Sequence, residues 1–399
     1  MPPRLPTLLA ALALLLASTA AARTCAGLPR LEVKTLPGFC VGVITRDLRF
    51  PRGVLPLPGG DVLVAEMGGW ERNRGSIARL RRDANGRYTL TRVLTGLDRP
   101  HGIILGPDGR VYVGEASRVF RFDPANPAAS RQDVIGGTSG VAALPDSGRH
   151  PLTALAFDAQ RRLIVNVGSA SDNCQGPEGP PTGPLCAEAE GTHPRGALRR
   201  YVLKWPEGKV SAWGTLARGL RNSMALALHR SGTLLQAENS RDAINLADPR
   251  LSDAQYPHDE LNVIVSGAHY GWPYCFDMAR NSPEFPHYAC ANTRKPAALL
   301  PAHAAPLGMA YYTGPRAPRD LEGRLVVAYH GYRPSGHRVV AFAVSPRGVP
   351  QGAPLELIGG WEARADRPQG KPVDVRPGPD GALYLTEDGN GTLLRWSTE

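Results

Sequence analysis

Seven residues spread through the chain combine one neutral base with several cations. They are Arg49, Asp98, Arg99, His150, Arg221, Asn222 and Lys371. A histidine titrates close to neutral pH and can therefore take a proton from a substrate. Cations around such a base are typical of a site for an acidic ligand. Each residue alone could be an ordinary loop or surface residue, so they indicate a site only if the fold brings them together.

A second group of residues surrounds the stretch from Asp259 to Ile264, where an acidic pair begins a short apolar run. The residues Tyr270-Gly271-Trp272-Pro273 follow this run, and Gly and Pro there predict a tight turn flanked by aromatic rings. Asn239-Ser240-Arg241-Asp242 lies upstream. Taken alone, the pattern predicts a strand and a stacked turn, and its neighbours are what indicate function.

The elements that position these residues form a repeat of apolar strand, tight turn and apolar strand. The copies begin near Gly53, Ile103, Leu155, Leu226, Met309 and Val373. Six hairpins leave about sixty residues per unit, which is enough for a four-stranded blade with insertions. We therefore predict an all-β fold, a six-bladed β-propeller with loop insertions. A pair of β-sandwiches is the alternative.

The repeat also supplies a register for the candidate site. Arg49, Asp98, His150 and Arg221 stand eight residues before the first turn residue of their hairpins, and Arg99, Asn222 and Lys371 stand one residue later. Equivalent strand ends meet at one face of a propeller, so these residues should surround one mouth of the axis. Two long insertions, 174–194 and 239–274, are expected to carry function because loops on a rigid scaffold often do.

The first 22 residues have the pattern of a secretory signal peptide: Arg4, an apolar run from Leu8 to Leu16, and a small-residue cleavage site. Residues 23–399 are then expected to form a single domain, exported to the periplasm or the extracellular space. Six cysteines favour the local pairs 25–40, 174–186 and 275–290, and the absence of C-x-x-C makes a zinc site the weaker interpretation. The net charge of +10 comes from scattered residues and predicts no nucleic-acid arm.

The chain resembles the soluble pyrroloquinoline quinone (PQQ) sugar dehydrogenases, the glucose/sorbosone dehydrogenase family, from about residue 38 to the C-terminus. The sorbosone dehydrogenase-like branch is the most similar. The resemblance is carried by His150, by Gly219-Leu220-Arg221-Asn222, by Gln236-Ala237-Glu238-Asn239, by Asp259-Glu260-Leu261-Asn262, by Gly271-Trp272-Pro273, and by Gly378-Pro379-Asp380-Gly381 with Leu383-Tyr384.

This resemblance implies a six-bladed propeller that holds PQQ and Ca²⁺ at its mouth and oxidises an aldose, with an external quinone or cytochrome as electron acceptor. His150 would be the general base, and Arg221 would stabilise the charge that develops on the reduced quinone. Arg221, Asn222, Lys371 and Arg99 would bind the cofactor. The backbone carbonyls of Ser240 and Arg241 would hold calcium, a hard ion that prefers oxygen ligands.

The chain departs from the family pattern at three places. Val373 stands where the glucose enzyme has an arginine, and Phe50 stands where it has a glutamine. Ser169 aligns with the acidic partner of the catalytic histidine, and Asp172 could replace that acid only if its loop folds back. The alternatives are a calcium-dependent, lactonase-like hydrolase and a non-catalytic propeller that binds carbohydrate or protein.

Overall fold

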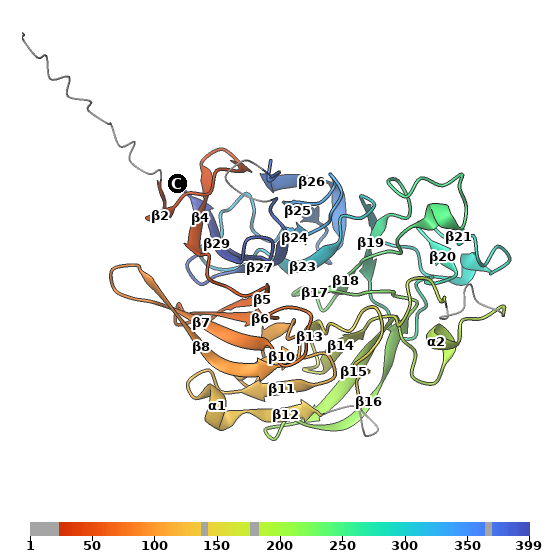
Figure 1. Cartoon of the computed structure of the whole chain (residues 1–399), viewed down its shortest axis with the longest axis horizontal. Coiled ribbons are helices and arrows are strands. Elements are labelled where there is room, and N and C mark those ends of the chain that lie inside the picture. Colours follow the sequence, from red (N-terminus) through yellow and green to blue (C-terminus); the bar gives the residue numbers. More distant parts are fainter. Residues whose placement is uncertain (1–23, 137–142, 176–182, 364–368) are drawn as a thin grey trace, which may run out of the picture.

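The computed structural model describes residues 24–136, 143–175, 183–363 and 369–399, and strands make up nearly all of its regular structure. Six antiparallel sheets surround a central axis, with the first strand of each sheet innermost (Figure 1). The first strands of neighbouring blades contact one another in the cyclic order β5, β9, β13, β17, β23 and β27, and β27 contacts β5 again. The predicted all-β, six-bladed propeller is therefore confirmed, while the predicted signal peptide lies outside the described residues.

The first three blades are four-stranded meanders that follow the chain. Their strands are β5 (Pro51–Pro56), β6 (Val62–Glu66), β7 (Gly75–Arg82) and β8 (Tyr88–Leu97); β9 (Ile103–Leu105), β10 (Val111–Gly114), β11 (Val119–Phe122) and β12 (Gln132–Ile135); and β13 (Leu155–Phe157), β14 (Leu163–Val167), β15 (Ala197–Lys204) and β16 (Lys209–Arg218). The two innermost strands of each blade are the hairpins that the sequence repeat predicts.

The last three blades include insertions and N-terminal strands. Their strands are β17 (Ala225–Leu228), β18 (Leu234–Glu238), β19 (Asp259–Val263) and β22 (Ala298–Leu300); β23 (Pro306–Tyr311), β24 (Leu325–Tyr329), β25 (Arg338–Val344), β26 (Pro350–Gly359) and β3 (Lys34–Thr35); and β27 (Pro372–Pro377), β28 (Leu383–Glu387), β29 (Thr392–Thr398) and β4 (Phe39–Thr45). The remaining elements are β1 (Thr24–Cys25), β2 (Leu28–Pro29), α1 (Pro127–Ser130), α2 (Ala187–Glu190), η1 (Ile244–Leu246), β20 (Cys275–Phe276), β21 (Arg280–Asn281) and η2 (Cys290–Asn292).

The turn of the repeat is stabilised in the same way in the second and sixth blades. In the second blade, Asp108 accepts hydrogen bonds from the Tyr112 hydroxyl at 3.1 Å and from Arg121 Nη1 at 2.7 Å. In the sixth blade, Asp380 accepts them from the Tyr384 hydroxyl at 3.1 Å and from Arg395 Nη2 at 2.8 Å. The Gly-Pro-Asp-Gly turn therefore binds the second and third strands of its blade, which explains why this motif marks the repeat so clearly.

The N-terminal part of the chain closes the ring. Strand β4 pairs with β29, the C-terminal strand, and completes the sixth blade. Phe39 on β4 stacks on Trp396 of β29 with ring centroids 4.2 Å apart, and the Trp396 side chain is fully buried. The sixth blade is thus built from both ends of the described chain, and its inner strand β27 contacts β5 of the first blade, which closes the ring.

Replacing Trp396 with alanine should therefore destabilise the protein by about 3–5 kcal/mol, because it empties a large cavity at the closure. The Trp70→Ala variant is the matched control, since the Trp70 side chain is 59% exposed, and its effect should stay within about 0.5 kcal/mol. Urea unfolding followed by circular dichroism measures both. Equal destabilisation of the two variants would contradict this account of the closure.

The three predicted disulfides are confirmed: Cys25–Cys40, Cys174–Cys186 and Cys275–Cys290. The first fixes the β1–β2 hairpin to the closing strand β4. The other two lie in the insertions of the third and fourth blades, at the right of Figure 1. Nowhere in the described parts of the chain is there a helix with the length and apolar character needed to cross a membrane.

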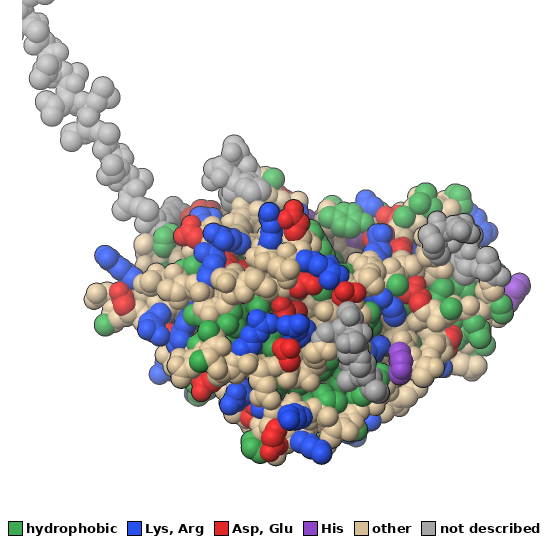
Figure 2. Space-filling model, turned by 60° about the horizontal axis from the view of Figure 1, so that its bottom comes forward, with side chains coloured by type: hydrophobic (Ala, Val, Ile, Leu, Met, Phe, Trp, Pro, Cys, Tyr) green, Lys and Arg blue, Asp and Glu red, His purple; other side chains and the backbone are tan. Residues whose placement is uncertain are grey.

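Charged side chains of both signs are mixed on the face of the molecule that Figure 2 presents. This distribution agrees with the prediction that the net charge of +10 belongs to scattered residues. The net charge therefore indicates little about function, and the charged residues must be considered one by one.

Candidate functional site

The loops at the predicted mouth are held by a repeated buried glutamate that the sequence analysis missed. In four blades, a backbone N–H just before the first strand donates to a glutamate at or just after the end of the second strand, over 2.7 to 2.9 Å. The pairs are Arg49 with Glu66, Asp98 with Glu115, Arg221 with Glu238, and Lys371 with Glu387. A recurring Glu at the end of the second apolar strand was the available signal. This shared bond places the predicted residues at the same edge of their blades.

His150 precedes the first strand of the third blade and is partly buried there. Its Nδ1 lies 2.8 Å from Ser169 Oγ, while Nε2 has no hydrogen-bond partner among the described residues. Burial lowers the pKa of His150 to about 2, and the charges of Arg221 and Arg149 act in the same direction. The imidazole is therefore neutral at physiological pH with Nε2 unbonded by the described residues, but its pKa lies well below the near-neutral value expected from the sequence.

Arg221 is buried beside His150, and its guanidinium is bound on several sides. Nε donates to the Asp172 carbonyl at 3.1 Å, Nη1 donates to the Asn239 carbonyl at 2.8 Å, and Nη2 bonds the Asp172 carboxylate. Asp242 lies 3.3 Å from Nη2. The loop places the Asp172 carboxylate against Arg221 and not against His150, the partner suggested from the sequence. Ser169 is the residue that contacts His150.

Asp242 connects the arginines of this region. One of its carboxylate oxygens lies 3.3 Å from Arg149 Nη2, and the other lies 3.5 Å from His303 Nδ1. An open cleft of about 490 Å³ adjoins this group and is lined in part by Arg149, Asp172, Arg241, Asp242 and Glu284. The cleft is bordered by charged side chains of both signs. The sequence analysis named Asp242 within the segment 239–242 but missed His303 as its partner.

The segment from Asn239 to Arg241 provides oxygen atoms that suit a hard cation. Within the described parts of the chain, the carbonyls of Ser240 and Arg241 accept no hydrogen bond. The side-chain oxygens of Asn222 and Asn239 are buried without a hydrogen-bond partner there. The Asn239 N–H donates to the Asn222 carbonyl at 3.1 Å, so the two asparagines are neighbours. Neutral oxygens of this kind fit Ca²⁺, which takes carbonyl and amide ligands.

The remaining predicted residues lie in different surroundings. Arg241 Nη1 bonds both carboxylate oxygens of Glu284, at 2.6 and 2.7 Å, so its side chain is already paired. Arg99 is paired with its neighbour Asp98 at 2.7 Å. The ammonium of Lys371 forms no hydrogen bond or salt bridge with any described residue. Of the three cations, Lys371 is therefore the one that most readily accommodates an anionic ligand.

An apolar cluster of buried side chains from several blades involves both Val373 and Phe50. Val373 packs in this cluster, and Phe50 packs against it from the edge. The other members are Met67, Leu152, Met224 and Leu307, which come from several blades. Both side chains therefore contribute to apolar packing in this structure.

The Tyr270-Gly271-Trp272-Pro273 turn links the two insertions. Trp272 Nε1 donates to the Asp172 carbonyl at 2.9 Å, which fixes the loop that carries the partner of Arg221. Gly271 adopts a φ of 117°, and this conformation strongly favours glycine. The spacing predicts only a tight turn with stacked rings. In the structure this turn also holds the Asp172 loop in place.

Three carboxylates are buried behind this turn, a feature the sequence analysis also missed. Burial raises the pKa of Asp259 to about 6, and it also raises the pKa values of Glu238 and Glu260. The acidic pair that opens the Asp259–Val263 strand was the visible signal. In the structure Asp259 accepts hydrogen bonds from the N–H groups of Ser240 at 2.8 Å and Ala305 at 2.6 Å, so it fixes the segment with the free carbonyls.

The structure is a six-bladed propeller with a neutral imidazole, cations and, among the described residues, oxygens without hydrogen-bond partners in the loops at the ends of its inner strands. The chain matches the family described as TrAA12-like over residues 33–394 and belongs to that family. The fold agrees with this membership, and so does the resemblance found in the sequence.

Similar proteins include sugar dehydrogenases. The chain is 26% identical to the pyrroloquinoline quinone-dependent pyranose dehydrogenase of Coprinopsis cinerea over 356 residues, which cover 78% of this chain and 45% of that protein. It therefore spans about half the length of this fungal relative. It is also 24% identical to the aldose sugar dehydrogenase YliI of Escherichia coli over 258 residues, which cover 63% of this chain and 61% of that protein.

Solved structures show the same fold. The holo form of the PQQ domain of Coprinopsis cinerea pyranose dehydrogenase has a TM-score of 0.70 at 23% identity and covers 94% of this chain and 99% of that one. The calcium structure of an AA12 enzyme of Trichoderma reesei has a TM-score of 0.71 at 18% identity and covers 93% and 98%. At these identities the similarity establishes the architecture alone.

Proposed function

We propose that the protein is an exported quinoprotein oxidoreductase that oxidises an aldose or a related sugar by hydride transfer to calcium-bound PQQ. The observation that carries this proposal is the pairing of a neutral His150, with one nitrogen able to accept a proton, and the arginine group beside it. The protein's membership of the TrAA12-like family and its similarity to sugar dehydrogenases support the same class of reaction.

When bound, PQQ would supply an ortho-quinone that accepts hydride from the sugar carbon, and calcium would polarise the quinone as a Lewis acid. His150 Nε2 would take the proton of the sugar hydroxyl as hydride leaves the adjacent carbon, so that a carbonyl forms and two electrons leave the sugar. Arg221 would place positive charge beside the acceptor, and Asp172 and Asp242 would hold that guanidinium in position.

The carboxylates of PQQ require cations, and the side chains of Lys371 and Arg49 form no ion pair with the described residues. Arg149 is about half exposed and paired only at 3.3 and 3.7 Å, so it too can turn toward an anion. Asn222 would bind the cofactor through its amide. We propose Arg99 as a further contributor of positive charge, acting from its ion pair with Asp98.

Calcium would bind to the carbonyls of Ser240 and Arg241, whose capacity as acceptors is unused by the described residues. The three disulfides and the predicted signal peptide support a location outside the cytoplasm. The physiological acceptor would be an external quinone or cytochrome.

Removing calcium should abolish tight PQQ binding and lower the melting temperature. A ligand present at one hundred times its Kd stabilises the folded state by about 2.7 kcal/mol, so saturating Ca²⁺ should raise the melting temperature measurably. Differential scanning fluorimetry in EDTA and in Ca²⁺ tests this, with Mg²⁺ as the control ion. Unchanged melting together with unchanged PQQ affinity in excess EDTA would refute the calcium site.

The test of the function itself is dye reduction by the reconstituted protein. With PQQ and Ca²⁺ present, addition of an aldose or pyranose should bleach a redox dye. Omission of PQQ should stop the reaction. If the dye stays oxidised with every sugar but a sugar lactone is hydrolysed in Ca²⁺ alone, the lactonase-like alternative is correct.

A further inference from the structure

We propose that Ser169, held in place by Ser171 and Glu188, is the positioning residue that orients His150 with Nε2 free to accept the substrate proton. This inference rests on the proposed function and concerns how the base is prepared. Ser169 is fully buried two residues after the end of the second strand of the third blade, and its N–H donates to the Arg221 carbonyl at 2.8 Å. It therefore contacts both residues proposed to act on the substrate and the cofactor.

A count of hydrogens determines which nitrogen of His150 is protonated. The Ser169 hydroxyl donates its one hydrogen to the Ser171 carbonyl at 2.7 Å. The 2.8 Å contact between Ser169 Oγ and His150 Nδ1 must then be an N–H···O bond in which the imidazole is the donor. A neutral imidazole has a single N–H, so Nε2 is left with a lone pair.

Glu188 holds the segment that carries Ser169. Its Oε2 accepts the Ala170 N–H at 2.6 Å, and its Oε1 bonds the Ser171 hydroxyl. The Ser171 hydroxyl oxygen also accepts the Cys174 N–H at 2.8 Å. Consecutive residues of the segment are thus bound to one carboxylate, which fixes the Ser171 carbonyl that Ser169 needs as its acceptor.

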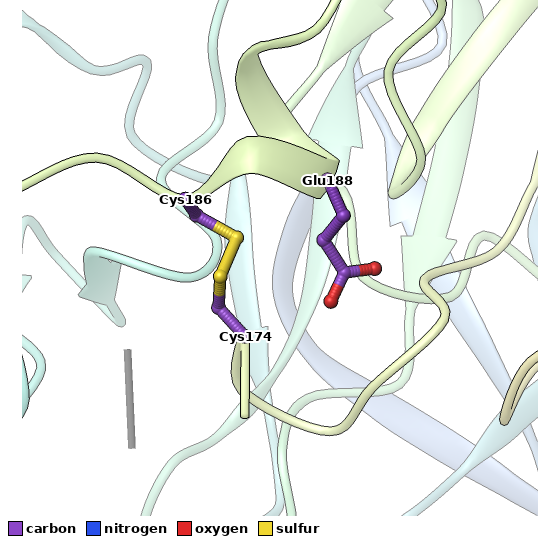
Figure 3. A group of neighbouring side chains, drawn as sticks. All are labelled: Cys174, Cys186 and Glu188. Carbon is purple, nitrogen blue, oxygen red and sulfur yellow. A yellow bond between two sulfur atoms is a disulfide. The ribbon is translucent and has the colours of Figure 1, made fainter. Parts of the chain in front are cut away.

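The Cys174–Cys186 disulfide completes this clamp. Figure 3 shows Cys186 and Glu188 projecting from the same short stretch, with Cys186 preceding α2 and Glu188 within it, while Cys174 comes from a separate segment. The sulfur and carboxylate atoms lie within 4.8 Å of one another, but the sulfurs are bonded to each other and are therefore unavailable as thiolate metal ligands. The cluster is better explained as the support of the segment from Ser169 to Asp172.

A serine orients the base without adding charge. The charged groups that face His150 are Arg221, Arg149 and Asp242. A carboxylate at position 169 would add a negative charge next to Nδ1 and favour the imidazolium. The Ser169→Asp variant should therefore raise the pKa of His150, whereas Ser169→Thr keeps a hydroxyl and should preserve the wild-type state.

The experiment compares wild type with Ser169→Ala, Ser169→Thr, Glu188→Gln and the exposed control Ser211→Ala. Long-range ¹⁵N–¹H correlation spectra of the apoprotein report which nitrogen of His150 is protonated, with no cofactor needed. We expect Nδ1–H in wild type, Ser169→Thr and Ser211→Ala, and loss of this single tautomer in Ser169→Ala. In the loaded enzyme, kcat of Ser169→Ala should fall ~10-fold with KM little changed, as for the loss of one hydrogen bond. Glu188→Gln should show the same changes to a smaller extent.

The inference is overturned if wild type carries its proton on Nε2, or if Ser169→Ala keeps both the Nδ1–H form and the wild-type kcat. A purely structural role would lower the melting temperature of Ser169→Ala without changing the tautomer. If wild type shows the Nδ1–H form but oxidises no sugar, the proposed function fails while the orientation of His150 by Ser169 stands. The two failures are therefore distinguishable.

Discussion

Replacing His150 with alanine should slow the sugar-dependent reduction of bound PQQ by ~10²–10⁴-fold, because it removes the general base. The neutral imidazole with an unbonded Nε2 is the group in the described site best suited to take the hydroxyl proton. PQQ binding should survive, since Lys371 and the arginines supply the positive charge. Stopped-flow absorbance of the loaded protein separates the chemical step from cofactor binding.

His287→Ala is a suitable control, because His287 is exposed, and it should reduce its cofactor at the wild-type rate. If His150→Ala, fully folded and loaded with PQQ, also reacts at the wild-type rate, another group is the base. If the variant only lowers stability while its folded fraction keeps full activity, His150 has a structural role.

Replacing Arg221 with alanine should damage both stability and cofactor binding. The change leaves the mostly buried Asp172 carboxylate without its closest cation, and breaking a buried ion pair typically costs about 3–5 kcal/mol. It also removes the link from Asp172 to Asn239, next to the proposed calcium ligands. Urea unfolding and PQQ titration in Ca²⁺ measure the two effects.

Arg250→Ala provides the matched control for Arg221→Ala. Arg250 also pairs with an aspartate, Asp248, at 2.8 Å, but its side chain is 89% exposed. Exposed pairs contribute little, so this variant should change stability by no more than about 0.5 kcal/mol and leave PQQ affinity unaltered. A similar loss in both variants would show that Arg221 has no special role at the mouth.

The propeller could be predicted from the sequence because its signal is local. Each blade contains a hairpin whose turn residues, such as Asp108 and Asp380, act on side chains a few positions away in the same blade. Such short-range patterns are visible in a single sequence. The register of the hairpins then identified His150 and Arg221 as residues before equivalent strands.

The closure and the ion pairs could not be predicted because they depend on long-range contacts. No sequence pattern in residues 39–45 indicates that this strand pairs with the C-terminal strand, more than 340 residues away. Likewise, Asp172 could be offered as a partner for His150, but the fold of its loop decides that it bonds Arg221 instead. The buried glutamates Glu66, Glu115, Glu238 and Glu387 repeat visibly in the sequence, yet their purpose appears only once the strand ends are placed.

We propose that a sugar delivers its electrons to PQQ held at this mouth. The most direct test is anaerobic mixing of the Ca²⁺- and PQQ-loaded protein with excess aldose, while the absorbance of the bound cofactor is recorded and the oxidised sugar is counted. We predict that the oxidised spectrum is replaced by the reduced one, with one oxidised sugar formed per bound cofactor. A spectrum that stays oxidised with every aldose and pyranose tried, while equilibrium titration shows PQQ bound, would contradict the account.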